Sequence, residues 1–141
     1  MSIALARQGE FEILKALTSE PITLRLFTND IYPHSDIVFR DLKQVSGSGY
    51  QPQTLSPLNW KISIINGSYT ASYPEVEFLF LNPFKNEIFG NYATKTVGGL
   101  QKVLWADRSE QAPMHIIIRG DRITVTPTLR LPKCQTEPEI V

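Results

Sequence analysis

Short runs in which apolar and polar residues alternate, separated by turn residues, dominate this sequence. The clearest run places Trp60, Ile62 and Ile64 in alternation, and Asn66-Gly67 follows it directly. Alternation with a period of two places every second side chain on one face of a β-strand, and Asn-Gly suits the positive φ angles of a two-residue hairpin turn. A return strand with the same spacing comes next, so the pattern predicts a β-hairpin.

The same alternation recurs about every ten residues as far as residue 129, with Gly, Pro, Asn or Asp between runs. The turn before the last run is Gly120-Asp121. About eight short strands at this spacing predict a mainly β fold, an antiparallel β-sandwich or jelly-roll-like domain. Pro127 lies inside the last run and lacks a backbone N–H, so that strand is predicted to lie at an edge or to carry a bulge.

One short helix is predicted near the start of the chain, over about residues 8–19, and strands from about residue 22. Phe11, Leu14 and Leu17 recur at helical spacing in this segment. The segment 36–45 fits a helix and a strand equally well, and both remain open at this point.

The composition predicts a single domain. The chain has 141 residues, of which 42% are apolar, and a domain of this size needs no disulfide or metal to hold a core. Residues 1–131 are predicted to form this β domain. Residues 132–141 have few apolar groups and are predicted to form an extended C-terminal arm.

The charge balance favours neither nucleic acid nor membrane as a partner. Lys and Arg number 14, as do Asp and Glu, so the basic excess that phosphate binding requires is missing. No apolar stretch approaches the roughly 20 residues that cross a bilayer, and the first residues do not resemble a secretory signal. The protein is therefore expected to fold in a cytoplasm.

Few residues could form a catalytic centre. His34 lies beside Pro in a loop, and His115 is expected on the outer face of its strand. Cys134 is the only cysteine, and it could pair with a histidine only if the C-terminal segment folded back. Glu75 and Glu77 share one face of a strand, as paired hydrolytic carboxylates could, but they are interpreted as exposed neighbours.

Oxygen ligands for a metal ion are also sparse. Asp30, Asp36 and Asp41 lie near one another, without the ligand spacing of a calcium loop. Asn29, Asp30 and Asp36 are interpreted as turn and capping residues. The sequence therefore predicts no catalytic, metal or cofactor-binding site and no cofactor.

Aromatic residues allow two interpretations. They could form a face on which sugars stack, or they could belong to the core. Most occupy the apolar phase of their strands, which favours the core for Trp60, Tyr69, Tyr73, Tyr92 and Trp105.

Several segments resemble, in order, those of a known protein family. They are Gly9-Glu10 with a Leu pair, the strand 24–30 ending in Thr-Asn-Asp, Gly49-Tyr50, the Leu-to-Trp segment 55–60, the Phe-Gly-Asn-Tyr run 89–92, Leu-Trp-Ala-Asp at 104–107, and the close 119–127. In these segments the chain resembles a family of small β-sandwich virion proteins of tailed bacteriophages. The resemblance covers residues 9–131.

This resemblance implies a non-enzymatic structural protein of a tailed-phage virion, assembled in the host cytoplasm. The expected role is a capsid decoration or cement protein that stabilises the head shell. The implied partners are the major capsid protein or other virion proteins, and the chain is expected to form a homo-oligomer.

Other functions remain open at this stage. One alternative is a tail or head–tail connector component, and another is a carbohydrate-binding module of a host-recognition apparatus. An enzyme would need a deep pocket near His34 or Glu75. Asn66, Gly67, Gly120 and Asp121 are predicted to have structural roles in turns, and no partner-contact residue is predicted.

Overall fold

The structure is a computed structural model that describes residues 3–131. It is mainly β, with one α-helix and antiparallel sheets arranged as in a β-sandwich. The predicted fold class is therefore confirmed, although the described residues form eleven strands where about eight were predicted. Cys134 and the predicted arm at 132–141 lie outside the described residues.

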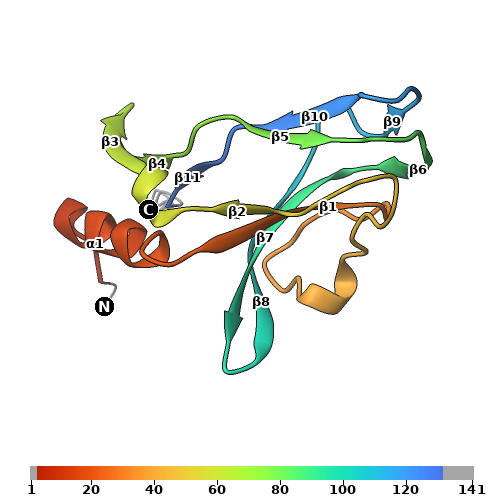
Figure 1. Ribbon diagram of the computed structural model, residues 1–141. Helices are drawn as coiled ribbons and strands as arrows, with labels where there is room; N and C mark the ends of the chain where they lie inside the picture. The colour runs from red at the N-terminus through yellow and green to blue at the C-terminus, as the bar shows by residue number, and fades with distance from the viewer. Residues whose placement is uncertain (1–2, 132–141) are drawn as a thin grey trace, which may run out of the picture.

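Helix α1 (Arg7–Leu17) begins and ends slightly earlier than the sequence predicts. The Thr18 hydroxyl donates a hydrogen bond to the Leu14 carbonyl at 2.8 Å, which closes the last turn. Leu14 is buried, and the ring of Phe11 meets the ring of Tyr69 edge-on, with centroids 5.4 Å apart. These contacts pack the helix against the small sheet at one end of the molecule (Figure 1).

The largest sheet has four antiparallel strands in the order β2-β1-β7-β8. They are β1 (Ile22–Phe27), β2 (Gln53–Leu55), β7 (Gly90–Val97) and β8 (Leu100–Arg108). Strands β7 and β8 form a long hairpin that turns at Gly98 and Gly99, both with positive φ. Figure 1 shows the tip of this hairpin projecting beyond the rest of the domain.

Three smaller sheets complete the domain. Strand β5 (Val76–Leu79) pairs with β10 (Arg122–Val125), and β6 (Phe84–Ile88) pairs with β9 (Met114–Ile116). The third sheet, next to helix α1, contains β11 (Thr128–Arg130), β4 (Ser68–Ser72) and β3 (Lys61–Ile65). Figure 1 shows β5 and β10 running as a second layer over the four-stranded sheet.

The main core fills the space between these two layers. Leu24 and Leu26 project from β1, and Phe78 projects from β5; all three are almost fully buried. The Tyr50 ring stacks on Phe78 with centroids 5.8 Å apart. This packing uses one face of each strand, as the alternating pattern predicts.

A smaller core lies on the opposite face of the four-stranded sheet. Phe27, Phe89 and Tyr92 are buried there beneath the loop that follows β1. The segment 36–45 belongs to this loop and forms neither an α-helix nor a strand. It contains the 3-10 turn η1 (Phe39–Asp41) and one isolated bridge to β1.

The predicted 60–73 hairpin is confirmed. Ile65 pairs with Ser68, and the two residues between them have φ angles of 52° at Asn66 and 79° at Gly67. The run from 123 to 129 is not a single strand as predicted. Pro127 separates β10 from β11, which belong to different sheets, because it has no N–H with which to continue a ladder.

A polar cleft between the layers as candidate functional site

Both histidines lie on the surface of the domain. His115 is exposed on β9, as predicted, and its Nε2 atom lies 3.7 Å from the carboxylate of Glu87. His34 is exposed in the loop after β1, and its ring accepts the backbone N–H of Asp36. Neither histidine borders the cleft described below.

The carboxylates singled out in the sequence have structural contacts. Asp41 accepts the N–H of Val38 at 2.9 Å, and Asp30 pairs with Arg108 at 2.6 Å. Asp36 is exposed. Within residues 3–131, no three His, Cys, Asp or Glu side chains converge as metal ligands would.

The two glutamates considered for hydrolysis are both exposed, as predicted. Glu75 precedes β5, and Glu77 lies within it. Glu77 forms an ion pair of 2.8 Å with Arg122 on the outer face of the second layer. Neither glutamate borders the cleft between the layers.

The predicted turn at Gly120-Asp121 is present. Gly120 has a φ of 89°, and the Asp121 carboxylate accepts the N–H groups of Ile117 and Ile118 at 2.9 and 3.1 Å. The aspartate therefore holds the loop between β9 and β10 closed.

The five aromatic residues lie mainly within the domain. Tyr92 is fully buried, and the other four are partly buried. Trp60 packs edge-on against Tyr73 and Trp105, with ring centroids 5.1 and 6.3 Å away, next to the main core. This arrangement fits the core interpretation better than a flat, exposed stacking face.

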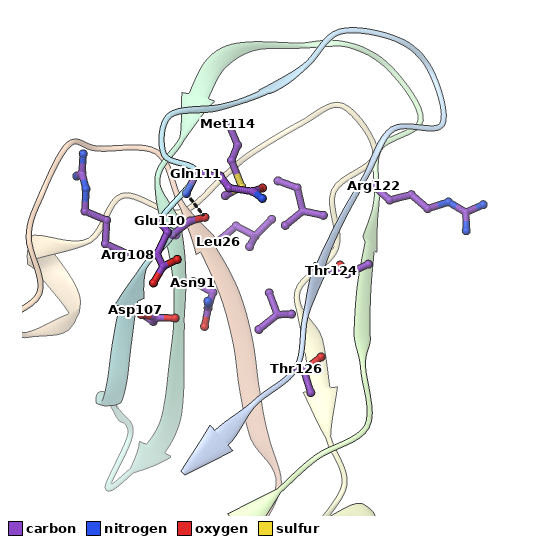
Figure 2. A pocket seen from close by; sticks show the side chains of 14 residues that line it. Leu26, Asn91, Asp107, Arg108, Glu110, Gln111, Met114, Arg122, Thr124 and Thr126 are labelled. Carbon is purple, nitrogen blue, oxygen red and sulfur yellow. Dashed lines mark hydrogen bonds between the residues drawn. The ribbon is translucent and has the colours of Figure 1, made fainter. Parts of the chain in front are cut away.

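A cleft of about 530 Å³ opens where the four-stranded sheet extends beyond the second layer (Figure 2). Asn91 pairs with Leu26 on one side and with Asp107 on the other. Cross-strand partners project to the same face of a sheet, so these three side chains form a row that continues the core-facing surface. The row changes from apolar to polar as it reaches the edge.

Two further segments complete the cleft. The turn after β8 contributes Glu110 and Gln111, and this turn is held by the Ser109 hydroxyl, which accepts the N–H of Gln111 at 3.1 Å. Strand β10 forms the facing wall with Ile123 and Val125, which also contact the main core. Figure 2 shows this strand across the cleft from Asn91 and Asp107, with Thr124 directed outward.

The charge inside the cleft is negative. Partial burial raises the pKa of Asp107 above its ordinary value, and the nearby Glu110 carboxylate raises that pKa further. Arg108 and Arg122 border the cleft, but Figure 2 shows both directed away from it. The Arg108 guanidinium lies 4.2 Å from the Tyr32 ring centroid and binds Asp30 instead.

Sequence reasoning missed this cleft. Asn91 and Asp107 occupy the same strand phase as Ala93 and Trp105, so two polar residues at core-facing positions were the available signal. That signal depends on the pairing of β7 with β8 and on the position of β10. Neither could be read from residue spacing.

A second hollow of about 680 Å³ lies beside the projecting β7–β8 hairpin. Its lining is more apolar than that of the cleft and includes Ile37, Val38 and Leu100, with Arg40 and Lys102 also in the lining. This hollow separates the hairpin from the 3-10 turn η1.

Comparisons with protein-family models, curated proteins and solved structures find no match to this chain. Among residues 3–131, no helix combines the length and apolar character needed to cross a membrane.

Proposed function

We propose that this chain is a non-enzymatic structural protein of a tailed-phage virion, a capsid decoration or cement protein that binds the head shell. The resemblance of residues 9–131 to small virion proteins supports the biological setting. The observation that carries the mode of action is the placement of exposed apolar side chains on projecting hairpins and turns.

These side chains occur as neighbouring pairs. At the tip of the β7–β8 hairpin, Val97 is 50% and Leu100 is 63% exposed. Ile64 and Ile65 are exposed at the end of β3, and Ile117 and Ile118 are exposed in the turn after β9. Single exposed apolar residues are ordinary, whereas grouped ones mark protein contact sites.

The segments that carry these pairs, namely the tip of the β7–β8 hairpin, the end of β3 and the turn after β9, lie in different parts of the domain (Figure 1). A decoration protein must contact several subunits of a shell that is already folded, and it needs a rigid body with several contact points. A packed β-sandwich with apolar tips meets that need. Association of such subunits around a capsid symmetry axis would give the expected homo-oligomer.

The first test is immunogold labelling of intact phage particles with antibody raised against this chain. Gold spread over the head is expected. Gold confined to the neck or tail would refute the decoration role and favour a connector or tail component. Absence of labelling, with the protein also missing from purified particles by mass spectrometry, would refute a virion role.

A binding assay tests the mode of action. Particles lacking the protein are mixed with purified chain, and bound protein is measured after sedimentation. The double variant Val97→Ser/Leu100→Ser is expected to bind more weakly than the parent. The control Thr54→Ser changes an exposed position in the body of the sheet, and it should bind like the parent. Equal binding by all three proteins would refute a role for the hairpin tip.

A further inference from the structure

Strand β3 forms an open edge of the small sheet next to helix α1 (Figure 1). Among the described residues the strand order of this sheet is β11-β4-β3, so one side of β3 has no neighbouring strand. An unpaired edge presents backbone N–H and C=O groups to any other strand, and most proteins protect such edges with charges, proline or a bulge. The only charged residue of β3 is Lys61, at its start.

The edge of the largest sheet, strand β8, has this protection. The pairing of β8 with β7 shifts register once, as at a bulge, and Lys102 and Asp107 place charges along the strand. Pro33 and Ile37, in the loop after β1, lie beside the middle of β8. Strand β3 has no register shift, no proline and no charge beyond its first residue, so its edge is free to pair.

The pairing of β3 with β4 determines which backbone groups point to the open edge. Ile65 pairs with Ser68 across the two-residue turn, and the closing pair of such a hairpin is hydrogen-bonded. Hydrogen-bonded and non-hydrogen-bonded positions alternate along an antiparallel pair, so every second residue of β3 bonds to β4. Ile62 and Ile64 are the residues between these positions. Their N–H and C=O groups therefore point away from β4, toward the open edge.

The side chains of the same two isoleucines form an apolar surface beside this edge. Ile64 is 53% exposed, and it pairs with Tyr69, whose ring contacts Phe11 of helix α1. Ile62 projects to the same face and lines a hollow of about 390 Å³ together with Phe11 and Trp60. An added strand would therefore meet both hydrogen-bonding groups and an apolar surface for its side chains.

We propose that two copies of this chain associate by pairing their β3 strands antiparallel about a two-fold axis at Ser63. In this register Ile62 of each copy lies opposite Ile64 of the other copy. The outward N–H and C=O groups of both strands then meet as hydrogen-bonded pairs. A two-fold contact requires a self-complementary surface, and β3 centred on Ser63 provides one. The pairing joins two three-stranded sheets into one continuous sheet.

The charges of the strand favour this arrangement. Lys61 of each copy lies opposite Ile65 of the other, so the two lysines lie at opposite ends of the joined strands. Parallel pairing in register would place the lysines opposite each other, and like charges in that position destabilise a sheet. The chain also carries no net charge that would oppose the association of two copies.

This interface would form the homo-oligomer expected of the proposed function, and it assigns Ile64 and Ile65 to a second copy rather than to the capsid shell. It does not depend on the virion role, because it rests on β3 alone and is tested with the purified chain. A monomeric chain could still label the phage head, and a dimeric chain could be absent from it. The two experiments therefore fail separately.

Sedimentation velocity of the intact chain over a wide range of concentrations measures the association. A reversible equilibrium between monomer and dimer is expected, because one strand edge is small compared with the roughly 800 Å² per partner that stable complexes bury. A chain that stays monomeric at every concentration would overturn the proposal and leave the edge for a strand of another protein.

Variants at one edge residue test the role of the backbone groups. Ile64→Pro removes the outward N–H and keeps the ladder with β4, so the dissociation constant of the dimer should rise about tenfold or more. Ile64→Lys places a charge at the edge and should weaken the dimer similarly. Ile64→Val keeps the N–H and an apolar side chain, and it should dimerise like the parent.

A control separates the edge from exposed apolar surface in general. Leu100→Lys changes an even more exposed residue on the β7–β8 hairpin and should leave dimerisation unchanged. Circular dichroism verifies that each variant is folded. Undiminished dimerisation by folded Ile64→Pro and Ile64→Lys, or an equal loss in Leu100→Lys, would overturn the proposal.

Disulfide trapping tests the register, with Cys134→Ser as the background because Cys134 is the only cysteine. Ser63→Cys places two thiols opposite each other at a non-hydrogen-bonded position, where Cα atoms lie about 4.5 Å apart, a separation that a disulfide bridges. Lys61→Cys places the thiols at opposite ends of the joined strands and should form no disulfide-linked dimer. Failure of Ser63→Cys to cross-link, or equally fast cross-linking by Lys61→Cys, would overturn the two-fold arrangement.

Discussion

Replacing Tyr50 with Phe removes one hydroxyl from the main core and leaves the ring in place. The Tyr50 oxygen accepts the backbone N–H of Leu26 at 3.1 Å and the side-chain amide of Gln44 at 3.0 Å. Leu26 lies in a central strand and is fully buried. The substitution therefore leaves a buried backbone donor without its acceptor.

The expected cost follows from that unpaired N–H. A buried donor left without a partner costs about 1–3 kcal/mol, whereas the partly buried Gln44 amide can turn toward water and adds little. The stacking of the ring on Phe78 is preserved, so no cavity forms. We expect Tyr50→Phe to lower the free energy of unfolding by about 1–3 kcal/mol, out of the 5–15 kcal/mol typical of domains.

Tyr92→Phe provides a matched control. The Tyr92 hydroxyl is also buried, but its oxygen has no hydrogen-bond partner among the described residues. Removing a buried hydroxyl that makes no bond leaves nothing unpaired. The free energy of unfolding is therefore expected to stay within about 0.5 kcal/mol of the parent or to rise.

Urea unfolding followed by tryptophan fluorescence measures both variants. Equal slopes with urea concentration are required for the comparison to be valid. The reasoning would be refuted if Tyr50→Phe were as stable as the parent, or if Tyr92→Phe lost as much stability as Tyr50→Phe.

Three further predictions concern the cleft, the second core and a close backbone approach. Gly90→Ala should lower the free energy of unfolding by about 1–3 kcal/mol or more in the same urea assay, because a Cβ there would lie 2.1 Å from the Asp107 carbonyl oxygen. The control Gly67→Ala lies at an open turn with positive φ and should lower the free energy of unfolding by only about 1 kcal/mol. Equal losses in the two variants would contradict this prediction. Burial raises the pKa of Tyr92 from 10.0 to about 12. The stability that the neutral Tyr92 hydroxyl contributes is therefore complete below pH 10 and is lost as the pH rises toward 12. In an ultraviolet titration Tyr92→Phe should lack the ionisation step near pH 12, and a titration curve identical to that of the parent would contradict this prediction. Because the pKa of Asp107 is raised, its ionisation destabilises the fold as the pH rises above the ordinary value of 3.8. Asp107→Asn should therefore be more stable than the parent near neutral pH, but not below pH 3.8. The reverse order of stability in thermal unfolding would refute this prediction.

The cleft and the projecting tips arise from the same feature of the fold. The four-stranded sheet is wider and longer than the layer packed on it, so β8 and the end of β7 are only partly covered. Where the cover ends, core-facing positions become polar at Asn91 and Asp107. Beyond that, the hairpin extends into solvent and exposes Val97 and Leu100.

Local signals in the sequence predicted the elements that depend on neighbouring residues. Asn66-Gly67 specified a two-residue turn, because both residues tolerate positive φ, and the flanking alternation determined which faces pair. Gly120-Asp121 likewise formed its predicted turn. The exposed position of His115 followed from strand alternation alone.

Several strands escaped prediction because they have no periodic pattern of their own. Strand β2 has three residues, and β6 carries Lys85, Asn86 and Glu87 in succession. These segments form strands because a neighbouring strand supplies hydrogen-bond partners. That stabilisation depends on context and leaves little trace in residue order.

The sequence by itself determined that this chain forms short antiparallel strands with one helix, because turn chemistry and side-chain alternation act between residues close along the chain. Only the tertiary structure decided that the chain changes sheets at Pro127 and that Asn91, Asp107 and Val125 share one cleft. Strand order and layer overlap depend on which apolar faces can be buried together. This packing involves residues far apart in sequence, and it forms the cleft.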